Sequence, residues 1–233
     1  MISSSIIKRW ASILNIIGCI QFIILTTIAM LYYAGGTYVD SSTTNYQFWY
    51  NFFSDLGRTI AHSGISNITA FILFIIAFSV WGIFQIPFFI AFTFLFTHIK
   101  NLRVISPTAS ILGILSGICY IGIAFTPSNL LNPIHELFVG IGFSSIFASI
   151  ILYAIAIFQN KEFSNFYAIT LTISAAILTI YFILLYLHPS IRTPRELLIQ
   201  ATGQKIMMYT LLLCGILLGY GTLQHELHDL VPK

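Results

Sequence analysis

Charged side chains are scarce in this chain. Asp, Glu, Lys and Arg make up only 7% of its 233 residues, whereas about a quarter is typical of soluble domains. Hydrophobic residues account for 58%, and the mean hydropathy is +0.92. Most side chains must therefore face lipid, which leaves α-helices or a closed β-barrel as the possible folds. Because the apolar runs reach the ~20 residues that cross a bilayer and do not alternate, we predict an all-α, polytopic transmembrane helical bundle.

The chain also lacks the features of several functional classes. A net charge of +3 without a basic patch does not indicate a nucleic-acid partner. Cys19, Cys119 and Cys214 lie in different apolar runs and are expected to be core residues, not disulfide partners or metal ligands. The sequence has no phosphate-binding loop, serine-hydrolase elbow or dinucleotide fingerprint. We therefore expect no cofactor.

Six membrane spans are predicted, in a single transmembrane domain that covers residues 1–233. Gly35–Gly36 ends the first span, and Asn132–Pro133 is a cap-plus-proline signal that begins the fourth. Pro87 is expected to kink the second span. A capping-box pattern at Thr193–Glu196 opens either a short surface helix or the extended start of the sixth span. The expected spans are residues 11–32, 67–97, 106–125, 133–158, 165–187 and 205–222.

Basic residues predict the orientation of the bundle. Both termini are expected in the cytoplasm, because this places the larger number of basic residues inside. The inside set is Lys8, Arg9, Lys100, Arg103, Lys161 and Lys233, and the outside set is Arg58, Arg192, Arg195 and Lys205. We therefore predict a multi-pass protein of the cell membrane, with membrane lipid as its partner.

Stripes of small residues favour close packing of the spans. Such stripes let helix backbones approach each other in lipid, where the hydrophobic effect does not drive association. They occur in three spans, at Gly113 and Gly117, at Gly140 and Ser144, and at Gly215 and Gly219. The stripes leave the oligomeric state open.

Ionisable residues are concentrated in residues 51–67, NFFSDLGRTIAHSGISN. This stretch holds Asp55, Arg58 and His62, and the predicted topology places it on the outer side of the membrane. Ionisable groups at a membrane are costly and are therefore candidates for function. The same side is predicted to hold further candidates from the fourth span and from the loop after the fifth: His135, Glu136, His188, Arg192 and Arg195.

Each candidate also has a purely structural explanation. Asp55 and Arg58 are spaced i, i+3 and could form a salt bridge that fixes the loop, or they could bind a ligand. Asp55 could equally cap the turn before Gly57. His62 fits a solvated interface residue better than a ligand-binding one.

The fourth span contributes the candidate catalytic residues, His135 and Glu136. Imidazole suits general acid–base chemistry, whereas a Glu near a helix N-terminus is stabilised by the helix dipole without any function. Arg192 and Arg195 are expected to contact lipid phosphates. A zinc site is chemically possible, but no local spacing supports it, since its ligands would come from three segments: His62, His135, Glu136 and His188.

Two patches of the sequence resemble a known family. In the first, Tyr46 and Asn51 lead into Ser54–Gly57, and Asn67 opens the next span. The second comprises Gly122, Pro127 and His135. These patches resemble the uncharacterised prokaryotic membrane proteins grouped as domain of unknown function family 998. The resemblance implies a six-helix bundle, distantly similar to the Frag/DRAM/Sfk-type membrane proteins linked to lipid handling. It points to Asp55 and His135 but implies no activity.

The leading hypothesis is a membrane protein that binds a lipid headgroup or similar amphiphile in an outer-side polar cavity. Asp55 and Arg58 would form the cavity, and His135 would be its titratable member. The alternative is an intramembrane hydrolase, possibly metal-dependent, that uses the outer-side His, Asp and Glu side chains. A small transporter is a weaker alternative, because no charge or pair of broken helices is evident at mid-membrane.

Overall fold

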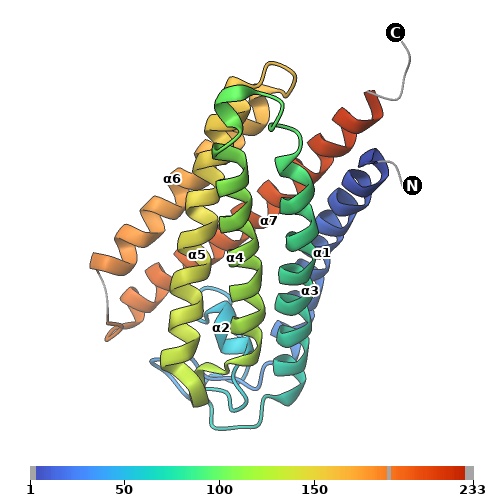
Figure 1. The fold of residues 1–233 in the computed structure, drawn as a ribbon. Helices are drawn as coiled ribbons and strands as arrows, with labels where there is room; N and C mark the ends of the chain where they lie inside the picture. The colour runs from blue at the N-terminus through green and yellow to red at the C-terminus, as the bar shows by residue number, and fades with distance from the viewer. Residues whose placement is uncertain (1–3, 188–189, 229–233) are drawn as a thin grey trace.

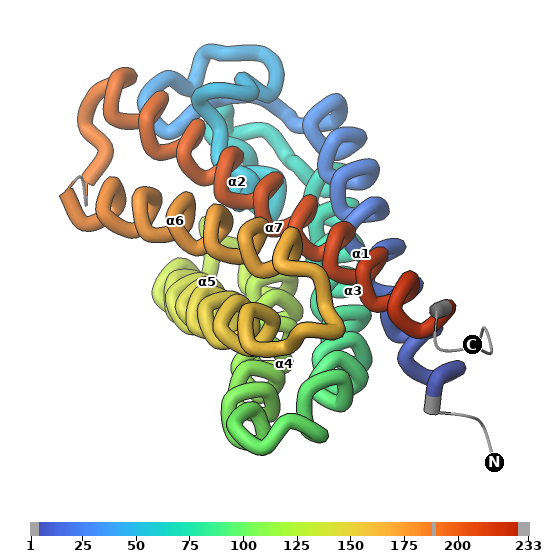
Figure 2. The backbone as a smooth tube through the Cα atoms, turned by 90° about the horizontal axis from the view of Figure 1, so that it is seen from above, coloured from blue at the N-terminus to red at the C-terminus, as the bar shows by residue number. Residues whose placement is uncertain are grey.

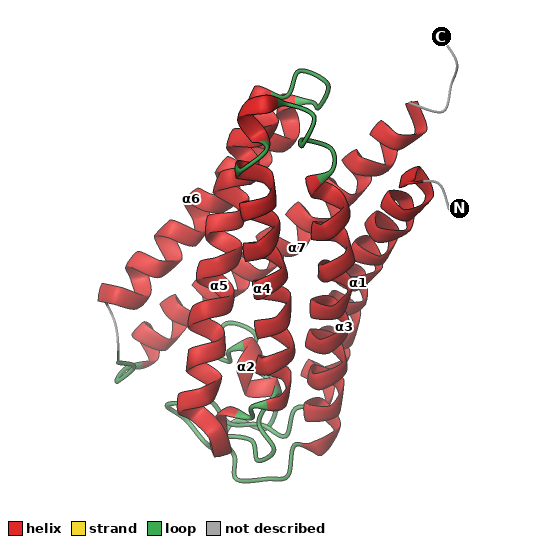
Figure 3. Cartoon of the chain, in the orientation of Figure 1, coloured by secondary structure: helices red, strands yellow, loops and turns green. Residues whose placement is uncertain are grey.

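The computed structural model describes residues 4–187 and 190–228, and over these residues it contains helices and no β-strand (Figure 3). Six helices are long and apolar enough to cross a membrane, which confirms the predicted all-α transmembrane bundle. The helices are α1 (Ser4–Tyr32), α2 (Phe53–Leu56), α3 (Ile68–Thr93), the 3₁₀ helix η1 (Lys100–Leu102), α4 (Ile105–Phe125), α5 (Ser128–Gln159), α6 (Asn165–Leu187) and α7 (Pro194–His228).

Each long helix packs against the next one in the chain, and the last, α7, also packs against α1. Each of α1, α3, α4, α5 and α6 contacts the next long helix, and α7 contacts both α6 and α1. Figure 1 shows that the first and last helices bring the two ends of the chain to the same end of the bundle. In the view from above, α4 and α5 are seen nearly end-on, whereas α6 and α7 run alongside them at an oblique angle (Figure 2). The predicted cytoplasmic location of both termini stays a prediction.

Several helix boundaries differ from the sequence expectation. α1 begins at Ser4, seven residues before the expected start, and α3 ends at Thr93, four residues before the expected end. α5 begins at Ser128, five residues before the expected start, with a break at Leu131, whose φ and ψ are −128° and 39°. The break precedes Pro133, whose ring disfavours regular helix in the preceding turn. α7 begins at Pro194, because the Glu196 carboxylate accepts hydrogen bonds from the backbone N–H groups of Arg192 and Thr193. Of the two expectations for the capping box, the extended sixth span is therefore correct.

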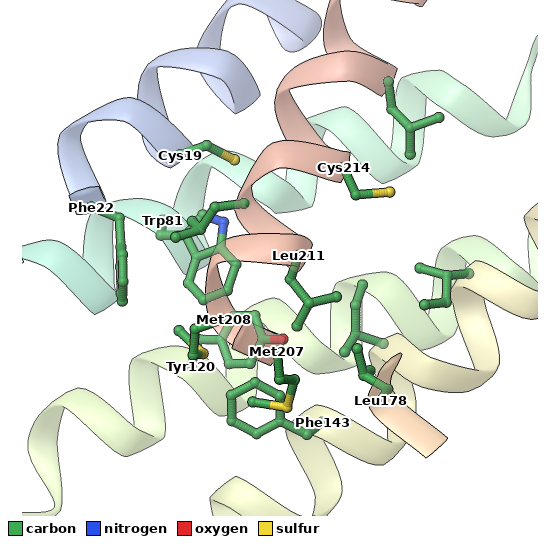
Figure 4. Close-up of a cluster of buried hydrophobic side chains, with 14 of the residues drawn as sticks. Cys19, Phe22, Trp81, Tyr120, Phe143, Leu178, Met207, Met208, Leu211 and Cys214 are labelled. Carbon is green, nitrogen blue, oxygen red and sulfur yellow. The ribbon is translucent and has the colours of Figure 1, made fainter. Parts of the chain in front are cut away.

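Aromatic rings fill the centre of the bundle (Figure 4). The rings of Trp81 in α3 and Tyr120 in α4 are stacked, with centroids 4.4 Å apart and an interplanar angle of 13°. Next to this contact, two glycines allow the backbones of α3 and α4 to lie close together. A Cβ atom on Gly82 would lie 2.4 Å from the carbonyl oxygen of Gly117. The stripe of small residues predicted in α4 therefore lies at a helix contact.

The α1–α3 connection, residues 33–67, fills the end of the bundle opposite the termini (Figure 1). It starts with Gly35 and Gly36, whose φ angles of 92° and 80° end the helical path of α1. Its short helix α2 lies between the long helices, where Phe53 and Leu56 are buried. The connection thus brings polar backbone and side chains into the interior of the bundle.

Candidate functional site

A cavity of about 540 Å³ lies beside α2, within the 300–1,000 Å³ range of small-molecule sites. Its polar lining comes from the α1–α3 connection, the start of α5, the α6–α7 loop and α7: Ser54, Asp55, Arg58, His62, Ser128, Asn132, His135, Glu136, Ser190, Gln200 and Gln204. Its apolar lining comes mainly from the long helices: Phe74, Phe78, Ile123, Val139, Phe143, Leu185 and Met208. The cavity therefore contains five of the sequence-predicted site residues, namely Asp55, Arg58, His62, His135 and Glu136.

Polar and apolar lining residues are separated along the helices. On α5, Asn132 and His135 precede Phe143. Phe143 lies 11 positions after Asn132, a separation of about 17 Å along a helix at 1.5 Å per residue. On α7, Gln200 and Gln204 likewise precede Met208. Because both helices begin at the loop end, the cavity has a polar end beside the loops and an apolar end inside the bundle.

Asp55 is buried, and its carboxylate is fully engaged by neighbouring groups. Oδ2 accepts hydrogen bonds from the side-chain amide of Asn51 and the backbone N–H of Phe52, both at 2.9 Å. Oδ1 lies 3.0 Å from Nε2 of His62. The bond from Phe52 caps the first turn of α2, as one interpretation of the sequence expected. Asp55 therefore holds the wall of the cavity in place and orients His62.

The contact with Asp55 corrects two interpretations of the sequence. His62 is not a freely solvated residue, since its side chain is 13% exposed and pairs with the carboxylate. Arg58 does not form the salt bridge with Asp55 that was one of the two possibilities for this pair; its Nε donates to the carbonyl of Ile60 at 3.1 Å. The i, i+3 spacing requires a continuous helix, and α2 ends at Leu56. Arg58 still lines the cavity.

His135 is buried in α5, and its imidazole is oriented by the preceding loop. Nδ1 lies 2.7 Å from the carbonyl oxygen of Thr126, which can only accept a hydrogen bond, so Nδ1 carries a proton. Nε2 is buried and has no hydrogen-bond partner among the described residues. Glu136 is exposed and accepts a hydrogen bond from Asn132 at 2.8 Å. His135 thus lines the cavity, and its Nε2 atom is an unpartnered nitrogen buried in the wall.

Lys205 is a buried cation that the sequence interpretation missed. It was expected at the very start of the sixth span and was counted among the outside basic residues, but it lies well inside α7 and is 1% exposed. Its ammonium group donates to the backbone carbonyl of Asn51 and lies 5.2–5.7 Å from the ring centres of Tyr46, Phe48 and Phe53. The signal available in the sequence is the aromatic cluster in residues 46–50, YQFWY, because aromatic faces attract a cation.

Asn51 joins these groups together. Its side-chain amide donates to the Gly36 carbonyl and to Asp55, and its backbone carbonyl accepts from Lys205 and from the hydroxyl of Tyr46. Burial, followed by the charge of the Asp55 carboxylate, raises the pKa of Tyr46 well above its ordinary value. The Tyr46 hydroxyl therefore stays protonated and able to donate.

Other contacts fix the α1–α3 connection to α7 and α5. The backbone N–H of Phe53 donates to the Gln204 side chain at 2.8 Å. Thr59 exchanges two hydrogen bonds with the side chain of Asn129, at 2.8 and 3.0 Å. The second contact brings together the two sequence patches on which the family resemblance rests.

Three predicted ligand-binding residues are not placed in the cavity. Arg192 and Arg195 are exposed and do not line it, and His188 lies outside the described residues. Over the described part of the chain, no group of three or more His, Cys, Asp or Glu side chains is arranged to hold a metal ion. The zinc site considered from the sequence included His188, so it stays an untested prediction.

Known proteins give no further guide to this site. Comparisons of the chain with models of protein families, with curated proteins and with solved structures find no match. The resemblance to domain of unknown function family 998 therefore stays a prediction. The six apolar helices establish the broader conclusion that this is an integral membrane protein.

Proposed function

We propose that this membrane protein binds a single amphiphilic molecule, such as a membrane lipid, in the cavity beside α2. The observation that carries the proposal is the division of the cavity into a polar end beside the loops, formed by the loops and the first turns of α5 and α7, and an apolar end inside the bundle. A molecule with a polar headgroup and an acyl chain matches both ends at once. A purely polar solute would leave Phe78, Phe143 and Met208 facing polar atoms.

A variant that fills the cavity tests this proposal. Gly140 lines the cavity, and a Cβ atom there would meet nothing within 4 Å, so Gly140→Trp can place an indole in the space without a backbone clash. The matched control is Ile141→Trp, one residue along α5, where the side chain is 40% exposed. Lipids that copurify with each protein would be extracted and quantified by mass spectrometry.

We expect Gly140→Trp to lose a lipid that wild type and Ile141→Trp retain in near-stoichiometric amounts. Thermal unfolding of the three proteins checks that each variant is folded. Equal lipid content in all three folded proteins would contradict the proposal.

A second candidate function is hydrolysis of the bound amphiphile. The supporting observation is the contact between His62 and Asp55, since a carboxylate that orients an imidazole is the arrangement of a general base in many hydrolases. Ser54 lines the same cavity. Release of fatty acid from a monoacylglycerol by the wild type, and its loss in His62→Gln, would support this function. No release above a protein-free control would contradict it.

A further inference from the structure

The cavity contains one buried polar atom that requires a partner. His135 is 5% exposed, and its Nε2 atom has no hydrogen-bond partner among the described residues. Most buried polar side-chain atoms are hydrogen-bonded, because leaving one unpaired costs about 1–3 kcal/mol when it is desolvated. His135 lines the cavity, but Nε2 itself has almost no accessible surface. A bound molecule can therefore supply its partner once the neighbouring side chains of the lining shift to admit it.

The other nitrogen of His135 determines what kind of partner fits. Nδ1 holds its proton against the carbonyl oxygen of Thr126, at 2.7 Å. In a neutral imidazole the remaining nitrogen carries a lone pair and accepts a hydrogen bond. The partner of Nε2 must then be a donor, such as a hydroxyl group.

The charged groups around the cavity do not favour an anion. Among the described residues that line the cavity, Arg58 is the only Lys or Arg. The same lining contains the carboxylates of Asp55 and Glu136. His62 is held by Asp55. The Glu136 carboxylate adds another hydrogen-bond acceptor to the polar end. With the negative charge of two carboxylates beside one Arg, the polar end suits a neutral headgroup better than an anion, and Glu136 is the carboxylate that can accept a hydrogen bond from it.

The position of His135 places this donor near the start of the acyl chain. His135 is followed one turn later on α5 by Val139 and two turns later by Phe143, both of which line the cavity. A group bonded to Nε2 therefore lies where the polar lining changes to apolar. In a monoacylglycerol, free hydroxyls occupy the corresponding place beside the single acyl chain.

We propose that the ligand is an amphiphile with a free hydroxyl near its acyl chain, of the monoacylglycerol type, and that this hydroxyl donates to Nε2 of His135. This inference rests on the proposed amphiphile-binding function and specifies its ligand class. Because Nδ1 donates to the Thr126 carbonyl, Nε2 is the atom that accepts a hydrogen bond. Because the lining changes from polar to apolar beside His135, the hydroxyl lies next to the start of the acyl chain.

The test compares an alcohol with its methyl ether, which cannot donate a hydrogen bond and is larger by two methyl groups. The full chain is purified in an amine-oxide detergent, which has no hydroxyl group. The shift of its thermal unfolding midpoint is measured against the concentration of 1-monooleoylglycerol or of its di-O-methyl ether. We expect the alcohol to bind at least about tenfold more tightly than the ether, the effect of one unmade hydrogen bond to a buried acceptor.

A variant assigns the difference to His135. In His135→Asn the side-chain amide can still donate to the Thr126 carbonyl in place of Nδ1, but the acceptor at Nε2 is lost. We expect this variant to bind alcohol and ether equally. His98→Asn, near the opposite end of the bundle, should keep the wild-type difference. If His135→Asn does not fold, the comparison of the two probes on wild type still decides whether donation matters.

The outcomes separate this inference from the function on which it rests. Equal, saturable binding of alcohol and ether by wild type would overturn the hydroxyl contact and leave amphiphile binding standing. Tighter binding of oleate, an anion without a hydroxyl, would overturn it in favour of an anionic ligand. If no probe binds and Gly140→Trp changes no copurified lipid, both the inference and the proposed function fail.

Discussion

Lys205, inside α7, donates a hydrogen bond through its ammonium group to the backbone carbonyl of Asn51, in the α1–α3 connection. The lysine is 1% exposed and the asparagine is fully buried. Asn51 in turn donates to Asp55, whose carboxylate contacts His62. The contact of one buried cation with one backbone carbonyl therefore links a membrane-spanning helix to the polar wall of the cavity.

Replacing Lys205 tests this link. Lys205→Met keeps the length of the side chain but removes the donor, so the Asn51 carbonyl loses one of its two hydrogen bonds. We expect a loss of about 1–3 kcal/mol in the free energy of unfolding, and a midpoint lower by several degrees. Limited proteolysis should also cut residues 33–67 faster. Lys161→Met, at the exposed turn after α5, is the control. A midpoint for Lys205→Met at or above that of wild type would contradict the expectation.

A carboxylate at position 51 should make stability depend on pH. The amide nitrogen of Asn51 lies 2.9 Å from both the Gly36 carbonyl and the Asp55 carboxylate, so an ionised side chain in Asn51→Asp would face two acceptors. This raises the pKa of the new carboxyl in the folded protein above its unfolded value of ~3.9. The folded protein tolerates the protonated carboxyl but not the ionised one. The free energy of unfolding of Asn51→Asp therefore falls as the pH rises through the pKa that this carboxyl has in the folded protein.

We expect the unfolding midpoint of Asn51→Asp to fall further below that of wild type at about pH 8 than at about pH 4.5. Asn51→Ala removes the same hydrogen bonds without adding a titratable group. Its difference from wild type should stay constant over this range. A pH-independent difference for Asn51→Asp would contradict the geometry.

The contact between Asp55 and His62 should appear as an energetic coupling. Their side chains are 7% and 13% exposed, and the two atoms are 3.0 Å apart. A double-mutant cycle with Asp55→Asn and His62→Gln should give a coupling of about 1–2 kcal/mol. The control is the pair His98 and Glu162, whose atoms are 3.5 Å apart and whose side chains are 55% and 66% exposed. That pair should give a coupling near zero. Similar couplings in the two cycles would contradict the role assigned to Asp55.

The six spans were predictable because long apolar runs, glycines and prolines leave few alternatives in a membrane. The capping box at Thr193–Glu196 left two possible helices open, and the hydrogen bonds to Glu196 show that α7 begins at Pro194. The burial of Lys205 was not predictable, since only its contact with the Asn51 carbonyl places it inside the bundle. The small-residue stripe in α5 was placed on the wrong face: Gly140 and Ser144 are exposed, whereas Gly142 is buried against α4. Spacing identifies a stripe, but the neighbouring helices decide which face is buried.

The residues that line the cavity were partly predictable, because charged residues are scarce in this chain. Asp55, His62 and His135 stood out because ionisable groups are costly in this setting, and all three line the cavity. Their pairing was not predictable, because it depends on α2 ending at Leu56 and on the connection folding back to bring His62 to Asp55. The free Nε2 of His135 follows only from the position of the Thr126 carbonyl.

Two glycines with similar backbone angles should respond differently to alanine. Gly36 and Gly64 have φ angles of 80° and 83°, so an alanine at either site is strained by about 1 kcal/mol or more. A Cβ atom at Gly64 would meet nothing within 4 Å, whereas one at Gly36 would lie 2.2 Å from the backbone nitrogen of Ser63. Gly36→Ala must therefore also displace the backbone that carries His62. We expect it to lower the free energy of unfolding by on the order of 3 kcal/mol, against about 1 kcal/mol for Gly64→Ala. Thermal unfolding of the two variants measures the difference, and equal losses would show that residues 62–63 do not pack against Gly36 as described.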